Sequence, residues 1–232
     1  EGCGMAPDFI RKYLFQLNPG PHPVKLVDLG NIKKGFTVSD TYFALSTVVA
    51  ELISNKVLPV ILGGSQDLTF ANYQAYQSLG QIINIVAVDP MFDLGRSEQE
   101  LSAQSYLSNI ILHQPNYLFN YANIGYQSYF IDQDALRLMK NLFFDTYRLG
   151  IVRESLEEVE PIVRNADMLS FDISSVRNSD APGNGNATPN GFYGEEACQI
   201  VRYAGLSDKL TSIGFYEVNP KFDKTGQTAH LV

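Results

Sequence analysis

Short apolar runs rich in β-branched residues alternate along the chain with segments in which apolar positions recur every three or four residues. Runs of the first kind are typical of strands buried on both faces, and the second spacing is typical of helices that pack on a sheet. The predicted strands are residues 24–29, 57–62, 82–88, 123–125, 147–152, 168–173 and 210–216. The predicted helices are residues 40–54, 68–79, 103–113, 134–144, 156–165 and 194–204. This alternation predicts a three-layer α/β/α fold around a mostly parallel, doubly wound sheet.

Several predicted helix ends carry a side-chain signal. Ser39 and Asp67 precede two of the helices and are predicted to cap them. Pro161 interrupts the helical pattern of 156–165, so that helix is expected to break or restart there. No linker, charge block or internal repeat divides the sequence. We therefore expect a single α/β domain over residues 1–232, cropped at both ends because the first residue is not Met and the last two residues continue an apolar pattern.

Composition narrows the class of protein. The 17 basic and 25 acidic side chains give a net charge of -8, which disfavours a broad cationic surface for nucleic acid or membrane lipid. No segment approaches the roughly 20 apolar residues of a membrane span. With two cysteines, three histidines and neither a CxxC nor an HExxH motif, a disulfide framework and a Cys/His zinc site are excluded. The expectation is a soluble protein of the reducing cytoplasm.

Acidic and glycine-rich segments lie at the ends of four of the predicted strands, at the edge of an open α/β sheet where ligands collect. Buried carboxylates at neighbouring strand ends need a partner, and a cation is one natural partner. The alternative for each aspartate is an ordinary helix cap or turn. Nucleotide binding has no support, because neither GxxxxGK[ST] nor GxGxxG occurs. The four segments are residues 63–67 (GGSQD), 89–93 (DPMFD), 170–174 (SFDIS) and 217–220 (EVNP).

Taken in this order, the four segments resemble the ureohydrolase superfamily of arginases, agmatinases and formimidoylglutamases. Members of that superfamily carry Gly-Gly-Asp-His-Ser, Asp-Ala-His-x-Asp, Ser-Phe-Asp-x-Asp and Glu-Val-Asn-Pro motifs around two manganese ions. Residues 6–11, 28–30 and 188–191 are similar to family landmarks as well, so the resemblance spans most of the chain. It implies an arginase-like fold, hydrolysis of C–N bonds in guanidino or formimino compounds, a small ligand of that class, and a homo-oligomer.

The resemblance assigns six positions to the two metals, in three pairs. The pair that bridges both metals is Asp89 and Asp172, the first metal's own pair is Gln66 and Asp93, and the second metal's own pair is Met91 and Ser174. Three positions keep a carboxylate. The other three have changed, because the family pattern has histidine at two of them (Gln66 and Met91) and aspartate at the third (Ser174).

These changes bear on metal content. A thioether and a neutral hydroxyl are poor ligands for a hard divalent ion, so the second site is expected to be empty. The remaining oxygens can hold at most one cation, Mn²⁺ or Mg²⁺. The alternative is a metal-free cluster satisfied by backbone amides, serines and water, with a Lys, an Arg or bound protons in place of the ion.

The same changes bear on activity, because the family reaction relies on two metals to lower the pKa of a water. We therefore expect weak or absent hydrolysis. A non-catalytic binding or scaffold protein and a one-metal hydrolase of another C–N bond are the alternatives. By resemblance, Glu217 pairs with the guanidinium-like group of the ligand. Its structural alternative is an ion pair with Arg153 or Arg177.

Other candidates for chemistry are expected to be structural. His113 lies in a helical stretch and is expected to be a surface or satisfied residue. Cys198 is expected on the buried side of its helix, as a core residue. The loop 94–104, where the family carries substrate-gripping groups, contains no histidine. The aromatic stretch 117–130 is expected to pack in the core or at a subunit interface.

Overall fold

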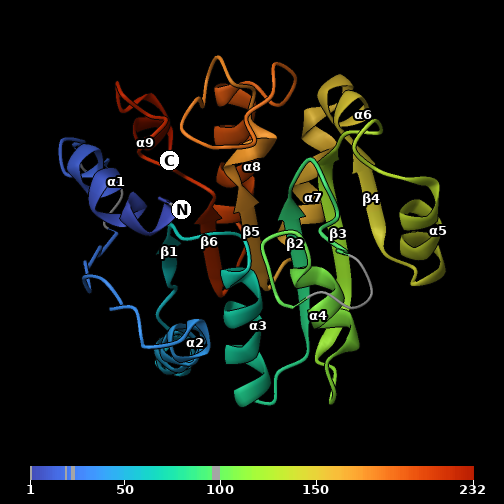
Figure 1. Ribbon diagram of the computed structural model, residues 1–232, viewed down its shortest axis with the longest axis horizontal. Helices are drawn as coiled ribbons and strands as arrows, with labels where there is room; N and C mark the ends of the chain where they lie inside the picture. Colours follow the sequence, from blue (N-terminus) through green and yellow to red (C-terminus); the bar gives the residue numbers. More distant parts are fainter. Residues whose placement is uncertain (1, 19, 22–23, 96–99) are drawn as a thin grey trace.

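A parallel six-stranded sheet forms the centre of the molecule (Figure 1). The computed structural model describes residues 2–18, 20–21, 24–95 and 100–232. Neighbouring strands of the sheet are parallel throughout, in the order β1-β6-β5-β2-β3-β4. The strands are β1 (Val60–Leu62), β2 (Ile83–Val88), β3 (Leu118–Tyr126), β4 (Asp145–Arg148), β5 (Met168–Asp172) and β6 (Ser212–Tyr216).

Helices cover both faces of this sheet. The α-helices are α1 (Ala6–Leu14), α2 (Val38–Ser54), α3 (Leu68–Ser78), α4 (Tyr106–Leu112), α5 (Gln133–Asn141), α6 (Leu149–Glu154), α7 (Val159–Arg164), α8 (Gly194–Gly205) and α9 (Gln227–Leu231). The 3-10 helices are η1 (Cys3–Met5), η2 (Leu156–Glu158) and η3 (Ile173–Ser175). Figure 1 shows α3 and α4 in front of the sheet.

The two faces of the sheet bury separate cores. On β2, Ile85 and Ala87 pack in one cluster with buried residues of α2, α3 and α4. Val86 and Val88, which point to the other face, pack in a second cluster with residues of α1, α6, α7 and α8. This alternation follows from the two-residue period of a strand. The predicted α/β/α layering with a parallel sheet is therefore confirmed.

The predicted strand 24–29 does not form. These residues have no strand partner, and Val24 and Leu26 are about 76% and 69% exposed. The segment is held instead by an ion pair between Asp28 and Arg11 of α1. A strand needs a neighbouring backbone for its N–H and C=O groups, and the apolar pattern alone does not supply one.

Two other predicted strands are displaced. The run 123–125 is part of the longer strand β3, and the run 147–152 covers the end of β4 and all but the last two residues of α6. Leu149 and Val152 are both buried, three residues apart on one face of α6. A short helix with one buried face therefore gives the same apolar run as a strand, which explains the error. Pro161 lies inside α7, and the restart predicted near it is the change from η2 to α7.

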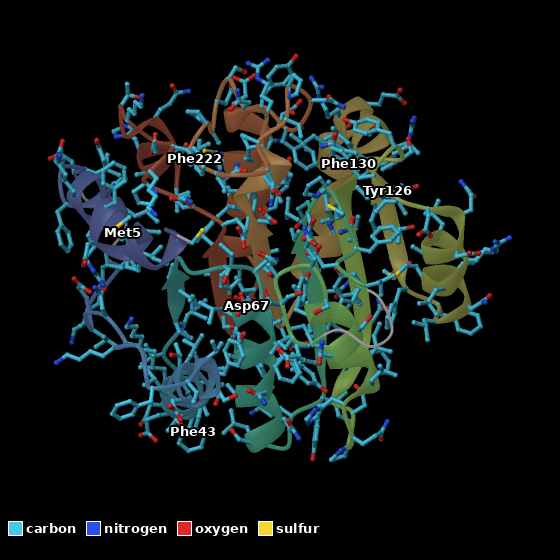
Figure 2. The ribbon with its side chains drawn as sticks, viewed as in Figure 1. Met5, Phe43, Asp67, Tyr126, Phe130 and Phe222 are labelled. Atoms are coloured by element: carbon cyan, nitrogen blue, oxygen red, sulfur yellow. The ribbon has the colours of Figure 1, made fainter. Side chains whose placement is uncertain are left out.

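Both predicted helix caps are wrong in detail. Thr37, not Ser39, caps α2, in a capping box with Asp40. Asp67 occupies the position before α3, but its carboxylate does not bond the helix; it accepts a hydrogen bond from the hydroxyl of Tyr42 on α2. Asp67 is buried and lies near the centre of the view in Figure 2. Phe43, which follows Tyr42 on α2, is exposed and lies at the edge of the molecule in that view.

Cys198 is exposed, contrary to prediction. Helix α8 buries Ala197, Ile200 and Ala204, whose spacing of three and four residues defines its inner face. Cys198 lies one position beyond Ala197 and therefore points away from that face. Within the described residues, no helix is both long and apolar enough to cross a lipid bilayer.

Candidate metal centre

The register of the sheet brings the strand-end segments together. Val88 of β2 is paired with Phe171 of β5, so Asp89 and Asp172 follow at adjacent positions on neighbouring strands. Phe171 is in turn paired with Phe215 of β6, and Glu217 comes two residues later. The carboxyl ends of β2, β5 and β6 thus place three acidic side chains along one edge of the sheet.

The turn after β1 completes this edge. Gly63 and Gly64 both have positive φ, +84° and +83°, which an L side chain rarely adopts. This double turn lets the Gly63 N–H donate to the carbonyl of Phe215 at 2.8 Å, and the Gly64 carbonyl accept from the N–H of Glu217 at 3.0 Å. Gln66 is consequently held beside the ends of β5 and β6.

Asp89, Asp93 and Asp172 form a buried carboxylate cluster. One carboxylate oxygen from each lies within 4.8 Å of the others, and the three side chains are nearly inaccessible to solvent. Asp93 reaches the cluster from the loop after β2 with φ +48°, a backbone conformation uncommon outside glycine. Its carbonyl accepts from the N–H of Leu107 at 3.3 Å, which ties this loop to α4.

The cluster concentrates negative charge without a basic partner. Among residues 2–18, 20–21, 24–95 and 100–232, no Lys, Arg or His forms an ion pair with any of the three aspartates. Burial, together with the neighbouring carboxylates, raises the pKa of Asp89 and Asp172 well above the ordinary value. Burial also raises the pKa of Asp93 to about 8. Without a cation, bound protons must therefore neutralise part of the cluster.

Gln66 has one unpaired side-chain oxygen, and its backbone N–H is bonded to Glu217 at the same edge of the sheet as the cluster. Its side-chain Nε2 donates to Ser170 Oγ at 2.9 Å, whereas its Oε1 is buried and has no hydrogen-bond partner among the described residues. Asp89 Oδ2 is likewise buried and unpartnered. Buried acceptors are seldom left unpaired in proteins. The Gln66 oxygen and the three carboxylates, which include the unpaired Asp89 Oδ2, make an all-oxygen donor set that suits one hard divalent cation.

The side chains of Met91 and Ser174 do not fit a second cation. Both residues hydrogen-bond the cluster through their backbone. The N–H of Met91 donates to Asp89 Oδ1, and the N–H of Ser174 donates to Asp172 Oδ1, each at 2.7 Å. A thioether and a hydroxyl offer no negative charge to offset dehydration of a divalent ion.

Glu217 is bound by neither of the arginines named as its structural alternative. Its Oε1 accepts the backbone N–H of Gln66 at 2.7 Å, and its Oε2 lies 3.9 Å from the thiol of Cys3. Arg153 pairs with Glu196 and Arg177 with Asp180. Glu217 has φ +65°, so the turn after β6 holds it in a strained conformation facing Gln66.

Comparisons with known proteins identify the family of this chain. A model of the arginase family matches residues 1–232. The chain belongs to the arginase family.

Curated relatives include the formimidoylglutamase of Staphylococcus aureus (strain MSSA476), which is 26% identical over 239 residues. The alignment covers 100% of this chain and 76% of the relative. Among solved structures, Trypanosoma cruzi formiminoglutamase with Mn2+2 has a TM-score of 0.89 at 18% identity, covering 100% of this chain and 82% of that one. Arginase from Bacillus subtilis has a TM-score of 0.80 at 21% identity, covering 100% and 89%. These structures establish an arginase-like fold.

Two contacts of the site in this arginase-family chain were not anticipated from the sequence. Cys3, in η1, approaches Glu217, and burial and that carboxylate raise the pKa of its thiol to about 11. Ser170 contacts Gln66 from the middle of β5. The strand period signals the second contact, because Ser170 precedes Asp172 by two residues and must share its face. No sequence signal locates the first.

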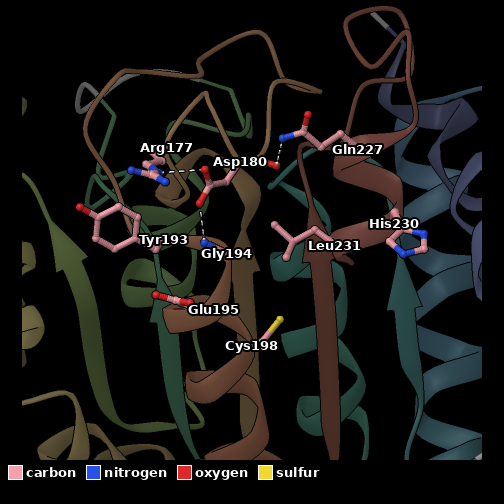
Figure 3. A pocket seen from close by; sticks show the side chains of 9 residues that line it. All are labelled: Arg177, Asp180, Tyr193, Gly194, Glu195, Cys198, Gln227, His230 and Leu231. Carbon is pink, nitrogen blue, oxygen red and sulfur yellow. Dashed lines mark hydrogen bonds and ion pairs between the residues drawn. The ribbon is translucent and has the colours of Figure 1, made fainter.

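A separate pocket of about 490 Å³ lies away from the carboxylate cluster, around the start of α8 (Figure 3). Its principal charged groups already have partners, since Arg177 pairs with Asp180 and Asp180 also accepts the N–H of Gly194. His113 lies partly exposed at the end of α4, edge-on to the rings of Phe70 and Tyr73. Residues 96–99 of the loop 94–104 lie outside the described part of the chain.

Proposed function

We propose that this chain is a formimidoylglutamase-like member of the arginase family whose site holds one divalent cation, and that it hydrolyses C–N bonds of formimino or guanidino compounds weakly or not at all. The observation that carries the proposal is the buried cluster of Asp89, Asp93 and Asp172, which has no basic ion-pair partner among the described residues. The matched formimidoylglutamases support the substrate class, and the Trypanosoma cruzi structure with Mn2+2 supports manganese.

The proposed cation site consists of the three aspartates and the amide oxygen of Gln66. Carboxylate and amide oxygens are the ligands that Mn²⁺ and Mg²⁺ prefer. Asp89 and Asp172 each retain one oxygen for the ion, because the other accepts a backbone N–H. A bound cation would replace the protons that the cluster otherwise has to carry.

The proposed loss of activity rests on Met91 and Ser174. In this reaction class, two divalent cations supply a water of lowered pKa at neutral pH. The two residues leave a second cation with shared carboxylates only, so this chemistry is incomplete. Within the described residues, no histidine lies close enough to the carboxylate cluster to form an ion pair with it.

Glu217 is the proposed binding residue for the ligand. Its carboxylate lies at the same edge of the sheet as the cluster, and burial raises its pKa, so a cationic amidinium or guanidinium group is the partner that would stabilise its charged form. The retention of this carboxylate, while the second metal's ligands have changed, also favours the second candidate function. In that function the chain is a binding or scaffold protein that holds the ligand without turning it over.

Two further proposals concern where the chain acts and how it assembles, and only the second rests on the resemblance to the family. We infer that the chain acts in the cytoplasm and assembles as a homo-oligomer. Light scattering of the purified protein measures the second directly, with a mass well above 25.8 kDa as the expected result.

A hydrolysis assay tests the proposed function. The protein is incubated with Mn²⁺ and N-formimino-L-glutamate, L-arginine or agmatine, beside the variant Gln66→His/Met91→His/Ser174→Asp. We expect the unmodified protein to be at least about a hundredfold slower than this variant, since each cation contributes several kcal/mol to such reactions. Asp172→Asn in the triple variant is the control that removes the gain. Turnover by the unmodified protein in the usual range of about 1–10³ s⁻¹ would contradict the proposal.

A further inference from the structure

Ser170 fixes which end of the Gln66 side chain is left without a hydrogen-bond partner. Ser170 lies in the middle of β5, is 1% exposed, and shares the face of Asp172, two residues later. Its hydroxyl accepts a hydrogen bond from Gln66 Nε2 at 2.9 Å. A carboxamide has one donor end and one acceptor end, so this contact leaves the oxygen of Gln66 turned away from Ser170 and unpaired.

Thr69 holds the serine hydroxyl in this role. It lies on α3, one turn after Gln66, is fully buried, and its Oγ1 is 2.7 Å from Ser170 Oγ. A hydroxyl has one proton and two lone pairs. When the proton of Ser170 goes to Thr69, only lone pairs remain toward Gln66, and these bind the amide N–H but not the amide oxygen.

We propose that Ser170, held by Thr69, is a positioning residue that makes the amide oxygen of Gln66 a ligand of the cation. This inference rests on the proposed function, since it requires a cation at the carboxylate cluster. Gln66 stands where the family pattern has histidine. An amide can present either its oxygen, which binds a cation, or its NH₂ group, which does not. An imidazole is held in the binding orientation by a hydrogen bond from its other nitrogen. The Gln66–Ser170–Thr69 contact supplies the orientation that the replaced histidine would have obtained from its own second nitrogen.

The positioning role of Ser170 applies only when residue 66 is an amide, so a variant with a carboxylate at position 66 serves as the control. A glutamate at position 66 presents an oxygen whichever way its side chain turns. Ser170 should therefore matter for metal affinity when residue 66 is Gln and matter little after Gln66→Glu. A merely structural role of Ser170 would weaken metal binding equally in both backgrounds.

The experiment measures Mn²⁺ dissociation constants by calorimetry and by Mn²⁺ electron paramagnetic resonance for the full chain, Ser170→Ala, Gln66→Glu and Gln66→Glu/Ser170→Ala. Ser170→Ala should weaken Mn²⁺ binding about 10- to 100-fold in the unmodified background, the usual effect of removing a contact behind a ligand. It should weaken binding less than about threefold in the Gln66→Glu background, so that the two changes are coupled. Thr69→Val, which keeps the side-chain shape, repeats the test if Ser170→Ala does not fold.

The outcomes separate the two proposals. Equal losses in both backgrounds, or no loss in the unmodified one, overturn the positioning role while leaving the cation site standing. If the unmodified protein binds no Mn²⁺, the proposed function fails first and the positioning role fails with it.

Discussion

Asp89 and Asp172 end neighbouring strands in the same way: in each, Oδ1 accepts the N–H of the residue two positions later at 2.7 Å. Those later residues are Met91 and Ser174, whose side chains have lost the ligand groups expected from the family pattern. The backbone turns at these positions therefore still orient the two carboxylates. The geometry of the carboxylate cluster thus depends on the backbone at residues 91 and 174 and not on their side chains.

Restoring the missing ligands should create the second site. Because the turns at residues 91 and 174 are intact, Gln66→His/Met91→His/Ser174→Asp should raise the manganese content from about one to about two ions per chain. Plasma mass spectrometry after dialysis measures the content. Gln66→His alone is the control and should stay near one, because it changes only the first metal's ligands. A triple variant that gains no ion would show that residues 91 and 174 do not face the site.

The stability of the metal-free protein should fall as pH rises. Burial raises the pKa of Asp93 from 3.8 to about 8, and that of Asp172 also lies well above 3.8. Between those pH values the folded chain binds more protons than the unfolded chain, so the free energy of unfolding decreases by up to about 1.4 kcal/mol per pH unit for each extra proton. This contribution is complete below pH 3.8 and is lost as pH rises through about 8.

Urea unfolding in EDTA at about pH 5.5 and about pH 8 checks this sign, and Mn²⁺ should stabilise more at the higher pH because it replaces the protons. Asp93→Asn is the matched control, since it removes one of the titrating groups and should flatten the dependence. A metal-free protein that becomes more stable between these pH values would contradict the protonated cluster.

Glu217→Gln should separate ligand binding from cation binding. The amide oxygen of the new side chain can still accept the N–H of Gln66, but the charge that pairs with a guanidinium is gone. We expect L-arginine or agmatine to bind at least about tenfold more weakly, and the Mn²⁺ affinity to fall by less, because Glu217 is near the aspartates but is not one of the proposed ligands. Calorimetry measures both, with Glu195→Gln, an exposed change on α8, as the control. Equal ligand affinity in the two variants would remove Glu217 from the ligand site.

The fold class followed from the sequence because buried parallel strands and amphipathic helices have distinct periods. The segment 24–29 shows the limit of that pattern: it has the side chains of a strand, but strand formation depends on a neighbour that the pattern does not encode. The run 147–152 shows another limit, since α6 buries only Leu149 and Val152 and is too short to display a helical period.

The candidate site was predictable to a similar degree. The order of the strand-end motifs placed Asp89, Asp93 and Asp172 together, because strand register fixes what lies at the end of neighbouring strands. The contact of Cys3 with Glu217 joins η1 to the turn after β6, 214 positions apart, and no periodicity links the two residues. Loop conformations of this kind depend on backbone turns such as the left-handed one at Glu217. A positive φ at a residue other than glycine is not predictable from the residue type.

The manganese stoichiometry of the unmodified chain tests the central claim most directly. Protein purified in Mn²⁺, dialysed and measured by plasma mass spectrometry should contain about one ion per chain, and Asp172→Asn should reduce this to near zero. Two ions per chain in the unmodified protein would contradict the assignment of Met91 and Ser174 as lost ligands.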